Sequence, residues 1–134
     1  SSLLVGETRT TVSPTGSDDL ITLYDAIPLP YGPSRVAIGA TLGIDGQKQT
    51  RVFVSCFDSR YVSVYDPKGR RIEANIRTGR GPQAIAFDPI KPYMYIAHFT
   101  DSYIGVVDLD ESHSSTFMSI VATLGLPKPP RESK

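Results

Sequence analysis

The sequence lacks most features that would name a chemistry. It has one cysteine, so no internal disulfide can form. It has no tryptophan. Fourteen acidic and fourteen basic residues cancel, so no charge excess selects nucleic acid or an anionic membrane. No apolar run approaches the roughly 20 residues of a membrane span. No phosphate-binding loop, hydrolase elbow or zinc-protease motif occurs. Neither a cofactor nor a catalytic class is therefore indicated.

What the sequence does contain is a repeat. Residues 51–66, RVFVSCFDSRYVSVYD, recur about 42 residues later as residues 93–108, YMYIAHFTDSYIGVVD. Each copy has two runs rich in β-branched and aromatic residues, joined by a polar hinge at residues 58–60 or 100–102. Such runs favour strands, and such hinges favour hairpins. A strand repeat with a period in the forties predicts the blades of a β-propeller.

Flanking stretches complete each predicted blade. Gly32-Pro33 and Gly81-Pro82 mark turns before a first strand, because glycine and proline punctuate regular structure. The expected first strands are residues 35–41 and 83–88, with an insertion at 43–50 after the former, and the expected fourth strands are residues 72–78 and 117–124. The predicted organisation is a partial blade at 1–31, blades at 32–80 and 81–126, and a flexible tail at 127–134.

The N-terminal part is interpreted as a degenerate copy of the same hairpin. It spans residues 3–25, with a long polar tip loop at 8–19, and residues 27–31 take the place of an outer edge strand. Two and a half blades would leave two sheet faces bare, which soluble monomers rarely do. We therefore expect an incomplete ring, a fragment or a subunit, that other blades or chains complete.

The repeated strands resemble the YVTN-type β-propeller repeat. The stretches Tyr95-Ile96-Ala97-His98 and Phe53-Val54-Ser55-Cys56 stand where that family has Tyr-Val-Thr-Asn, and residues 79–89 and 103–108 resemble its inter-blade connection and third strand. The resemblance covers residues 20 to about 125 and departs at the motif asparagine, which is Cys56 in one copy and His98 in the other.

The resemblance implies a seven-bladed ring, often bacterial or archaeal and exported to the periplasm or the cell surface. Many such rings are binding scaffolds. Similar rings include lactonase-like proteins and the heavy subunits of quinone-dependent amine dehydrogenases, and fold alone does not choose among these roles.

The candidate ligand-binding residues are His98, Cys56 and Arg80. Cys56 and His98 occupy equivalent strand ends, but neighbouring sheets pack roughly 10 Å apart. A metal bond needs about 2 Å and a thiol–imidazole hydrogen bond about 3 Å, so we expect no direct pairing. Cys56 is expected to be a buried hydrophobe. His98 is either a ligand-binding rim histidine or, as we favour, a hydrogen-bonded substitute for the motif asparagine.

Arg80 lies between two glycines, where backbone N–H groups beside a guanidinium could hold a small anion. The glycines serve a tight inter-blade turn equally well.

Three aspartates end third strands, namely Asp25, Asp66 and Asp108. Their repetition predicts a structural role, in which each carboxylate accepts backbone N–H groups of the following turn. Asp108 with Asp110 and Glu111 could suggest calcium, but the spacing of oxygen ligands in a calcium loop is missing, so no metal site is predicted. Residues 112–116 are interpreted as a solvated loop.

The sequence thus predicts an all-β propeller of four-stranded antiparallel blades. Its favoured role is a non-enzymatic scaffold for protein or small-ligand binding in an exported or cell-surface assembly, without nucleic acid. The alternative is a lactonase-like hydrolase, or a subunit of a propeller-type dehydrogenase, using the rim around His98 and Arg80.

Overall fold

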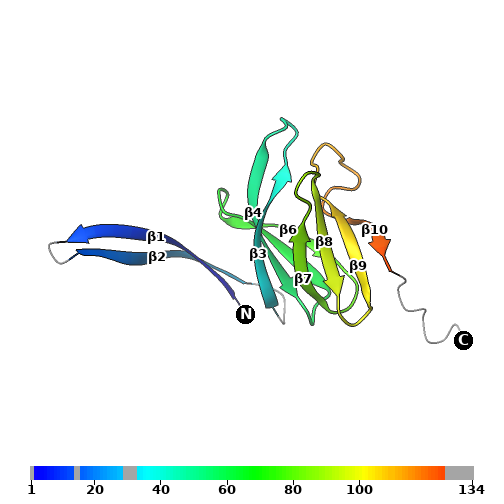
Figure 1. Ribbon diagram of the computed structural model, residues 1–134, viewed down its shortest axis with the longest axis horizontal. Helices are drawn as coiled ribbons and strands as arrows, with labels where there is room; N and C mark the ends of the chain where they lie inside the picture. The colour runs from blue at the N-terminus through cyan, green and yellow to red at the C-terminus, as the bar shows by residue number, and fades with distance from the viewer. Residues whose placement is uncertain (1, 14–15, 29–32, 126–134) are drawn as a thin grey trace, which may run out of the picture.

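The computed structural model describes residues 2–13, 16–28 and 33–125. These residues form β-strands, turns and loops, without a helix (Figure 1). Accordingly, the described part of the chain includes no helix suited to crossing a membrane. The all-β, antiparallel class predicted from the sequence is confirmed.

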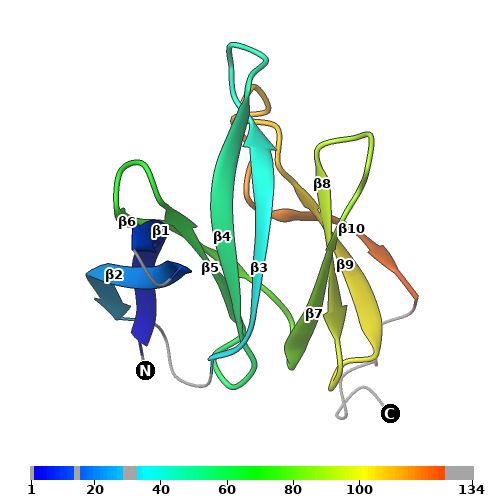
Figure 2. The same cartoon turned by 60° about the vertical axis from the view of Figure 1, so that its left-hand side comes forward.

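The strands form one hairpin and two sheets. The hairpin pairs β1 (Ser2–Ser13) with β2 (Gly16–Pro28). The first sheet contains, in chain order, β3 (Pro33–Leu42), β4 (Lys48–Cys56), β5 (Tyr61–Asp66) and β6 (Arg71–Arg77). The second contains β7 (Pro82–Phe87), β8 (Tyr93–His98), β9 (Tyr103–Asp108) and β10 (Ile120–Leu124). Figures 1 and 2 show the two sheets side by side, and the hairpin projects away from them in Figure 1.

The two sheets share their irregularities as well as their strand order. The hinge between the middle strands ends in a residue of positive φ in both, Arg60 at 57° and Ser102 at 61°. A register shift directly follows Pro33 in one sheet and Pro82 in the other. Shifts that bend a strand at equivalent places give the sheets a similar twist, which lets one stack on the other.

The core lies between the sheets. Its buried members come from the facing surfaces of both sheets and from the loop after β9: Phe53, Val62, Val64, Ile76, Met94, Ile96, Val107 and Leu109. The rings of Phe53 and Phe87 meet across the interface, with centroids 5.2 Å apart and planes tilted by 58°. A polar contact crosses the same interface, where Ser55 Oγ donates to the Gln83 carbonyl at 3.1 Å. Burial of these side chains is what holds the two sheets together.

The sheets present different faces to one another. Side chains alternate along a strand, so Phe53 points toward the second sheet whereas Val54 lies on the far face of the first. In the second sheet it is Ile96, the repeat equivalent of Val54, that enters the shared core. The interface therefore joins the Phe53 face of one sheet to the Ile96 face of the next.

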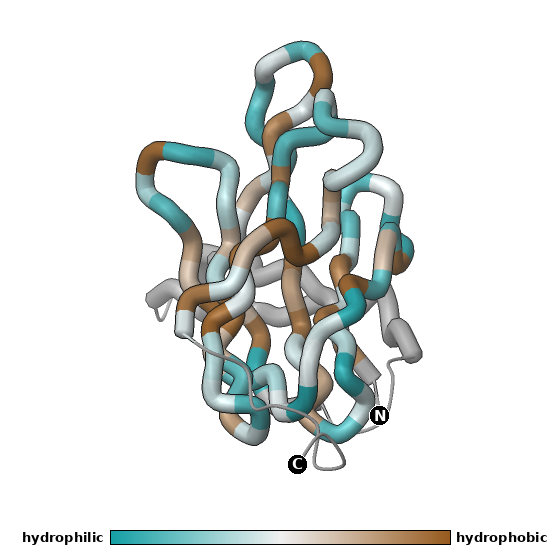
Figure 3. Tube along the Cα trace, turned by 90° about the vertical axis from the view of Figure 1, so that its right-hand side faces the viewer, coloured by the Kyte–Doolittle hydropathy of each residue, from teal (hydrophilic) through white to brown (hydrophobic). Residues whose placement is uncertain are grey.

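This arrangement turns one apolar face of the second sheet outward. Tyr95, the repeat equivalent of the fully buried Phe53, lies on this face and is partly exposed. Ile104 and Leu124 on the same face are 38% and 53% exposed. Figure 3, viewed from the side of β10, shows hydrophobic colour along the strands and also in some of the protruding turns. We call this surface the outer face of β7–β10.

Two predicted loops are shorter than expected. The polar stretch 8–19 was expected to be a hairpin loop, but β1 continues to Ser13 and β2 starts at Gly16. Threonine and other β-branched residues recur there, and they fit a strand despite their polarity. The expected insertion at 43–50 is likewise too long, because β4 already begins at Lys48, which pairs with Leu42.

Two predicted edge strands also differ. Ile27 and Pro28 continue β2, opposite Leu3 and Ser2, and do not start a separate strand. Residues 29–32 and the predicted tail at 127–134 lie outside the described residues. The last strand begins at Ile120 and not at residue 117, because Phe117 makes only an isolated bridge to Asp108.

Candidate functional site

His98 ends β8 and faces the interface between the sheets. The imidazole is 2% exposed, and its ring stacks on that of Tyr103 with centroids 4.1 Å apart. Nδ1 lies 3.3 Å from the Tyr103 carbonyl oxygen. A carbonyl only accepts, so the geometry requires the proton on Nδ1 of the neutral ring. Nε2 is buried and has no hydrogen-bond partner among the residues that the structure describes.

Burial controls the chemistry of His98. Removal from water lowers the pKa of the imidazole, and the Tyr103 carbonyl and the Asp101 carboxylate offset this only in part. The ring is therefore neutral at physiological pH and shielded from solvent. This position suits the hydrogen-bonded, asparagine-like role better than contact with a ligand from solution.

Arg80 lies at the same end of the strands, in the connection between the sheets. Its backbone N–H donates to Asp101 Oδ2 at 2.7 Å and its Nε donates to Asp101 Oδ1 at 2.9 Å. The backbone donation from Arg80 lowers the pKa of Asp101, and the guanidinium adds to the effect. Next to it, Gly81 has a φ of 72°, and a Cβ there would meet Thr100 Oγ1 at 2.5 Å. The guanidinium is thus tied to a carboxylate, which competes with any anion.

Cys56 is fully buried, and the structure does not bring it to His98. Cys56 lies on the far face of the first sheet, together with Val54, whereas His98 faces the interface from the second sheet. Its Sγ lies 3.8 Å from the Val54 carbonyl oxygen, and burial raises the pKa of the thiol, an effect that a hydrogen bond with Ser63 offsets only in part. A neutral, enclosed thiol is neither a nucleophile nor a metal ligand. Among the described residues, no three acidic, histidine or cysteine side chains gather as a metal site would require.

The repeated aspartates make turn contacts. Asp66 Oδ1 accepts the Lys68 N–H at 2.9 Å, and Asp108 Oδ1 accepts the Asp110 N–H at the same distance. Both contacts span two residues, as an Asx-type turn requires. Pro33 pairs with Cys56 and Pro82 with His98 at the starts of their sheets. The side chain of Asp25 and all of Gly32 lie outside the described part of the chain.

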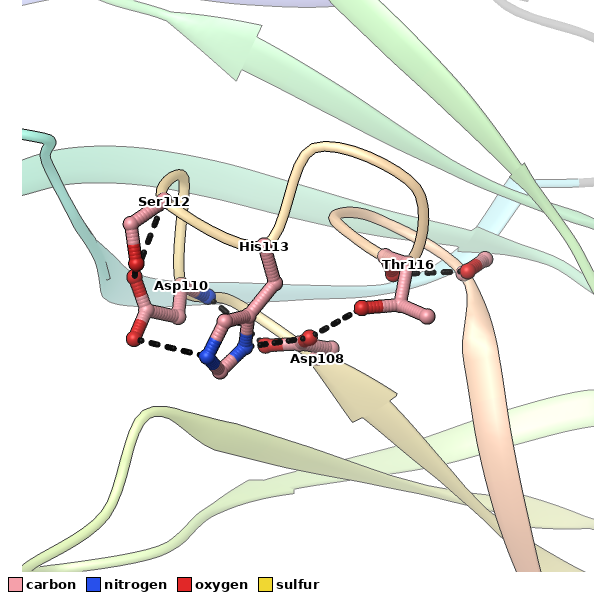
Figure 4. A network of polar contacts seen from close by, with 6 residues as sticks. Asp108, Asp110, Ser112, His113 and Thr116 are labelled. Atoms are coloured by element: carbon pink, nitrogen blue, oxygen red, sulfur yellow. Dashed lines mark hydrogen bonds and ion pairs between the residues drawn. The ribbon is translucent and has the colours of Figure 1, made fainter.

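Asp108 also anchors a side-chain network that the sequence did not predict (Figure 4). Its Oδ2 accepts from Thr116 Oγ1 at 2.6 Å and from His113 Nδ1 at 2.9 Å. His113 Nε2 lies 3.6 Å from Asp110 Oδ2, and Ser112 Oγ donates to Asp110 Oδ1 at 2.7 Å. Residues 112–115 are exposed, as expected of a solvated loop, but the expectation did not include the hydrogen bonds that His113 and Thr116 make to Asp108. The available signal was a repeated aspartate followed by histidine and hydroxyl side chains.

The charges of this network support one another. Burial alone would raise the pKa of Asp108, but hydrogen bonds from Thr116, the Asp110 backbone and His113 outweigh it and lower the pKa. The hydrogen bond to Asp108 raises the pKa of His113. Ser112 donates to a carboxylate and not to the histidine, so no activated nucleophile results. These hydrogen bonds hold the loop after β9 in one conformation.

The loop that carries this network ties the two sheets together. The Leu42 N–H donates to the Leu109 carbonyl at 2.8 Å, and the Glu111 N–H donates to the Leu42 carbonyl at the same distance. Glu111 Oε1 also accepts the Ile44 N–H at 3.2 Å. These bonds lie at the end of the strands opposite His98, since Tyr93 starts β8 there and His98 ends it.

At this second end the sheets leave an open groove of about 260 Å³ between β3, β7 and the turn from β7 to β8. Its apolar wall is formed by Ile38, Leu42, Phe87, Pro89, Ile90 and Leu109. The rim carries Lys48, Lys91 and Asp88. Sequence reasoning missed the groove because its walls come from segments about 50 residues apart.

Neither the known protein families nor curated proteins yield a match to this sequence. The interpretation of the candidate site therefore rests on its residues and their geometry. Of the three predicted ligand-binding residues, His98 and Arg80 lie at one end of the second sheet, and both interact with Asp101. Cys56 stands apart from them.

Proposed function

We propose that the chain is part of a β-propeller of the YVTN-repeat type. It acts as a non-enzymatic scaffold in an exported or cell-surface assembly, completed by further blades and presenting its loops to a protein or small-ligand partner. The observation that carries the proposal is the head-to-tail stacking of the two sheets. The interface joins unlike faces and leaves the outer face of β7–β10 uncovered, so a further sheet can stack there in the same way until a ring closes.

The outer face of β7–β10 is the surface on which the next sheet would pack. It is equivalent, residue for residue, to the face that carries Phe53, Val62 and Val64, all fully buried against the second sheet. A covering sheet would present side chains like those of Met94, Ile96 and Val107. Without it, an apolar sheet face is left in water, which monomeric proteins rarely tolerate.

A binding role is favoured over catalysis by the state of the candidate residues. The His98 ring is enclosed and neutral, the Cys56 thiol is buried, and Arg80 is occupied by Asp101. A hydrolase of this kind would need an accessible base or nucleophile beside a substrate. The loops at both ends of the strands are the accessible features.

The test measures the mass of the native particle by light scattering and the mass of its chains by intact mass spectrometry. The matched variants are Ile104→Lys on the outer face and Ile90→Lys on an exposed turn away from it. If separate chains complete the ring, Ile104→Lys lowers the particle mass and Ile90→Lys does not. If the remaining blades belong to the same polypeptide, Ile104→Lys instead lowers the melting temperature. A stable monomer of 134 residues, indifferent to both changes, would refute the proposal.

A further inference from the structure

The groove at the end opposite His98 has the properties of a small-ligand site. Its volume of about 260 Å³ lies just below the roughly 300 Å³ at which drug-sized pockets begin. Its apolar side chain Ile90 is 90% exposed. A ligand with one aromatic ring or a short aliphatic chain would cover apolar surface that now faces water.

The walls of the groove are fixed in place. The Phe87 ring lies against Phe53 on one side and over Gly39 on the other. The backbone bonds of Leu42 to Leu109 and Glu111 hold the far wall. A preformed site loses little conformational freedom on binding, which favours affinity for a small ligand.

The charges around the groove favour an anion. Lys48 and Lys91 make no salt bridge in the described part of the chain, although the Lys91 charge also stabilises the nearby Asp88 carboxylate. Asp88, the one carboxylate in the lining, already accepts hydrogen bonds from its own neighbourhood. It accepts the N–H groups of Ile90 and Lys91 and the Tyr95 hydroxyl, and these bonds lower its pKa to about 2. Its charge remains, but the two lysines outnumber it.

We propose that this groove binds a small carboxylate bearing one apolar group, with the apolar group against Phe87, Ile90 and Leu109 and the carboxylate between Lys48 and Lys91. This names a ligand class for the small-ligand role in the proposed function. The groove is complete within the two described sheets, so its occupancy does not depend on further blades. Failure here and failure of the ring are therefore distinguishable.

The experiment is a titration of the ¹⁵N-labelled full chain with 3-phenylpropionate, followed by amide chemical shifts. Its neutral analogue, 3-phenylpropan-1-ol, is the matched ligand control. We expect saturable shifts at Ala40, Ile90 and Leu109 with the carboxylate and much weaker binding of the alcohol. Equal binding of both compounds would overturn the role of charge, and shifts confined to other regions, or none, would overturn the site.

Variants then test the charged contact and the apolar contact separately. Lys48→Met and Lys91→Met are each expected to weaken binding about threefold, and about tenfold together, as exposed ion pairs do. Lys68→Met, in the turn from β5 to β6 and outside the groove, should change nothing. Ile90→Ser removes a largely exposed side chain and should weaken binding while leaving the fold intact. Unchanged affinity in the double lysine variant would overturn the proposal.

Discussion

Gly39 lies directly against the ring of Phe87, so close that a Cβ on residue 39 would fall 2.3 Å from Phe87 Cζ. No side chain other than hydrogen fits there while the ring stays between the sheets. The first strand of one sheet and the first strand of the next thus approach each other through a glycine. This contact also shapes one wall of the groove.

Gly39→Ala is therefore expected to destabilise the fold by about 1–3 kcal/mol, the usual cost of overpacking. Chemical denaturation of the variant measures this directly. In a Phe87→Leu background the smaller side chain leaves room for the methyl group. The same glycine substitution should then cost less, and a double-mutant cycle gives the difference. Equal costs in both backgrounds would show that the contact is not the cause.

Acidification is expected to destabilise the protein through His98. Burial gives the folded state a pKa below the unfolded value of about 6.5. The unfolded state then binds more protons, so this contribution to stability is lost as pH falls below about 6.5 toward the folded pKa. His98→Asn removes the titrating group and supplies the residue usual in YVTN repeats. Its free energy of unfolding should change less between pH 7 and pH 5 than that of the wild type, and an unchanged slope would contradict the assignment.

The sequence predicts the central strands well because their signal is local. The runs that become β4, β5, β8 and β9 are rich in β-branched and aromatic residues and end in turn residues, so short windows suffice. The hairpin β1–β2 was only partly predicted, since its threonine-rich segment looks like a loop when burial is unknown. The groove and the bonds from Leu42 to the loop after β9 join distant segments. A single sequence has no signal for such contacts.

The sequence predicts one contact of the Asp108 network but not the others. The repeated aspartate predicted the turn contact to Asp110, which Asp66 also makes to Lys68. Whether His113 and Thr116 fold back onto the carboxylate depends on the path of the loop. Asp66 has no such loop after it, since β6 begins at Arg71. The network is thus particular to the second sheet.

His113 should act on stability with the opposite sign to His98. Its hydrogen bond to Asp108 raises its pKa, so its contribution is fully present below pH 6.5 and is lost as pH rises through the folded pKa. His113→Gln should lower stability at pH 5.5 more than at pH 8. Denaturation at both pH values provides the measurement. A deficit that is the same at both values would mean that the imidazole contributes only as a neutral hydrogen-bonding group.

Thr116→Val tests whether the Asp108 network, which holds the loop after β9, also stabilises the junction between the two sheets. The change is nearly isosteric but removes the hydroxyl that donates to Asp108 Oδ2 at 2.6 Å, and the carboxylate is 3% exposed. Loss of a hydrogen bond to a buried charge should cost about 1.5–3 kcal/mol. Thr123→Val, on an exposed position of β10, is the control and should lie within about 0.5 kcal/mol of the wild type. Amide hydrogen exchange shows where stability is lost: in Thr116→Val the Leu42 amide, which bonds across to Leu109, directly after β9 of the other sheet, should lose protection. If only the loop after β9 loses protection, the network stabilises that loop and not the junction between the sheets.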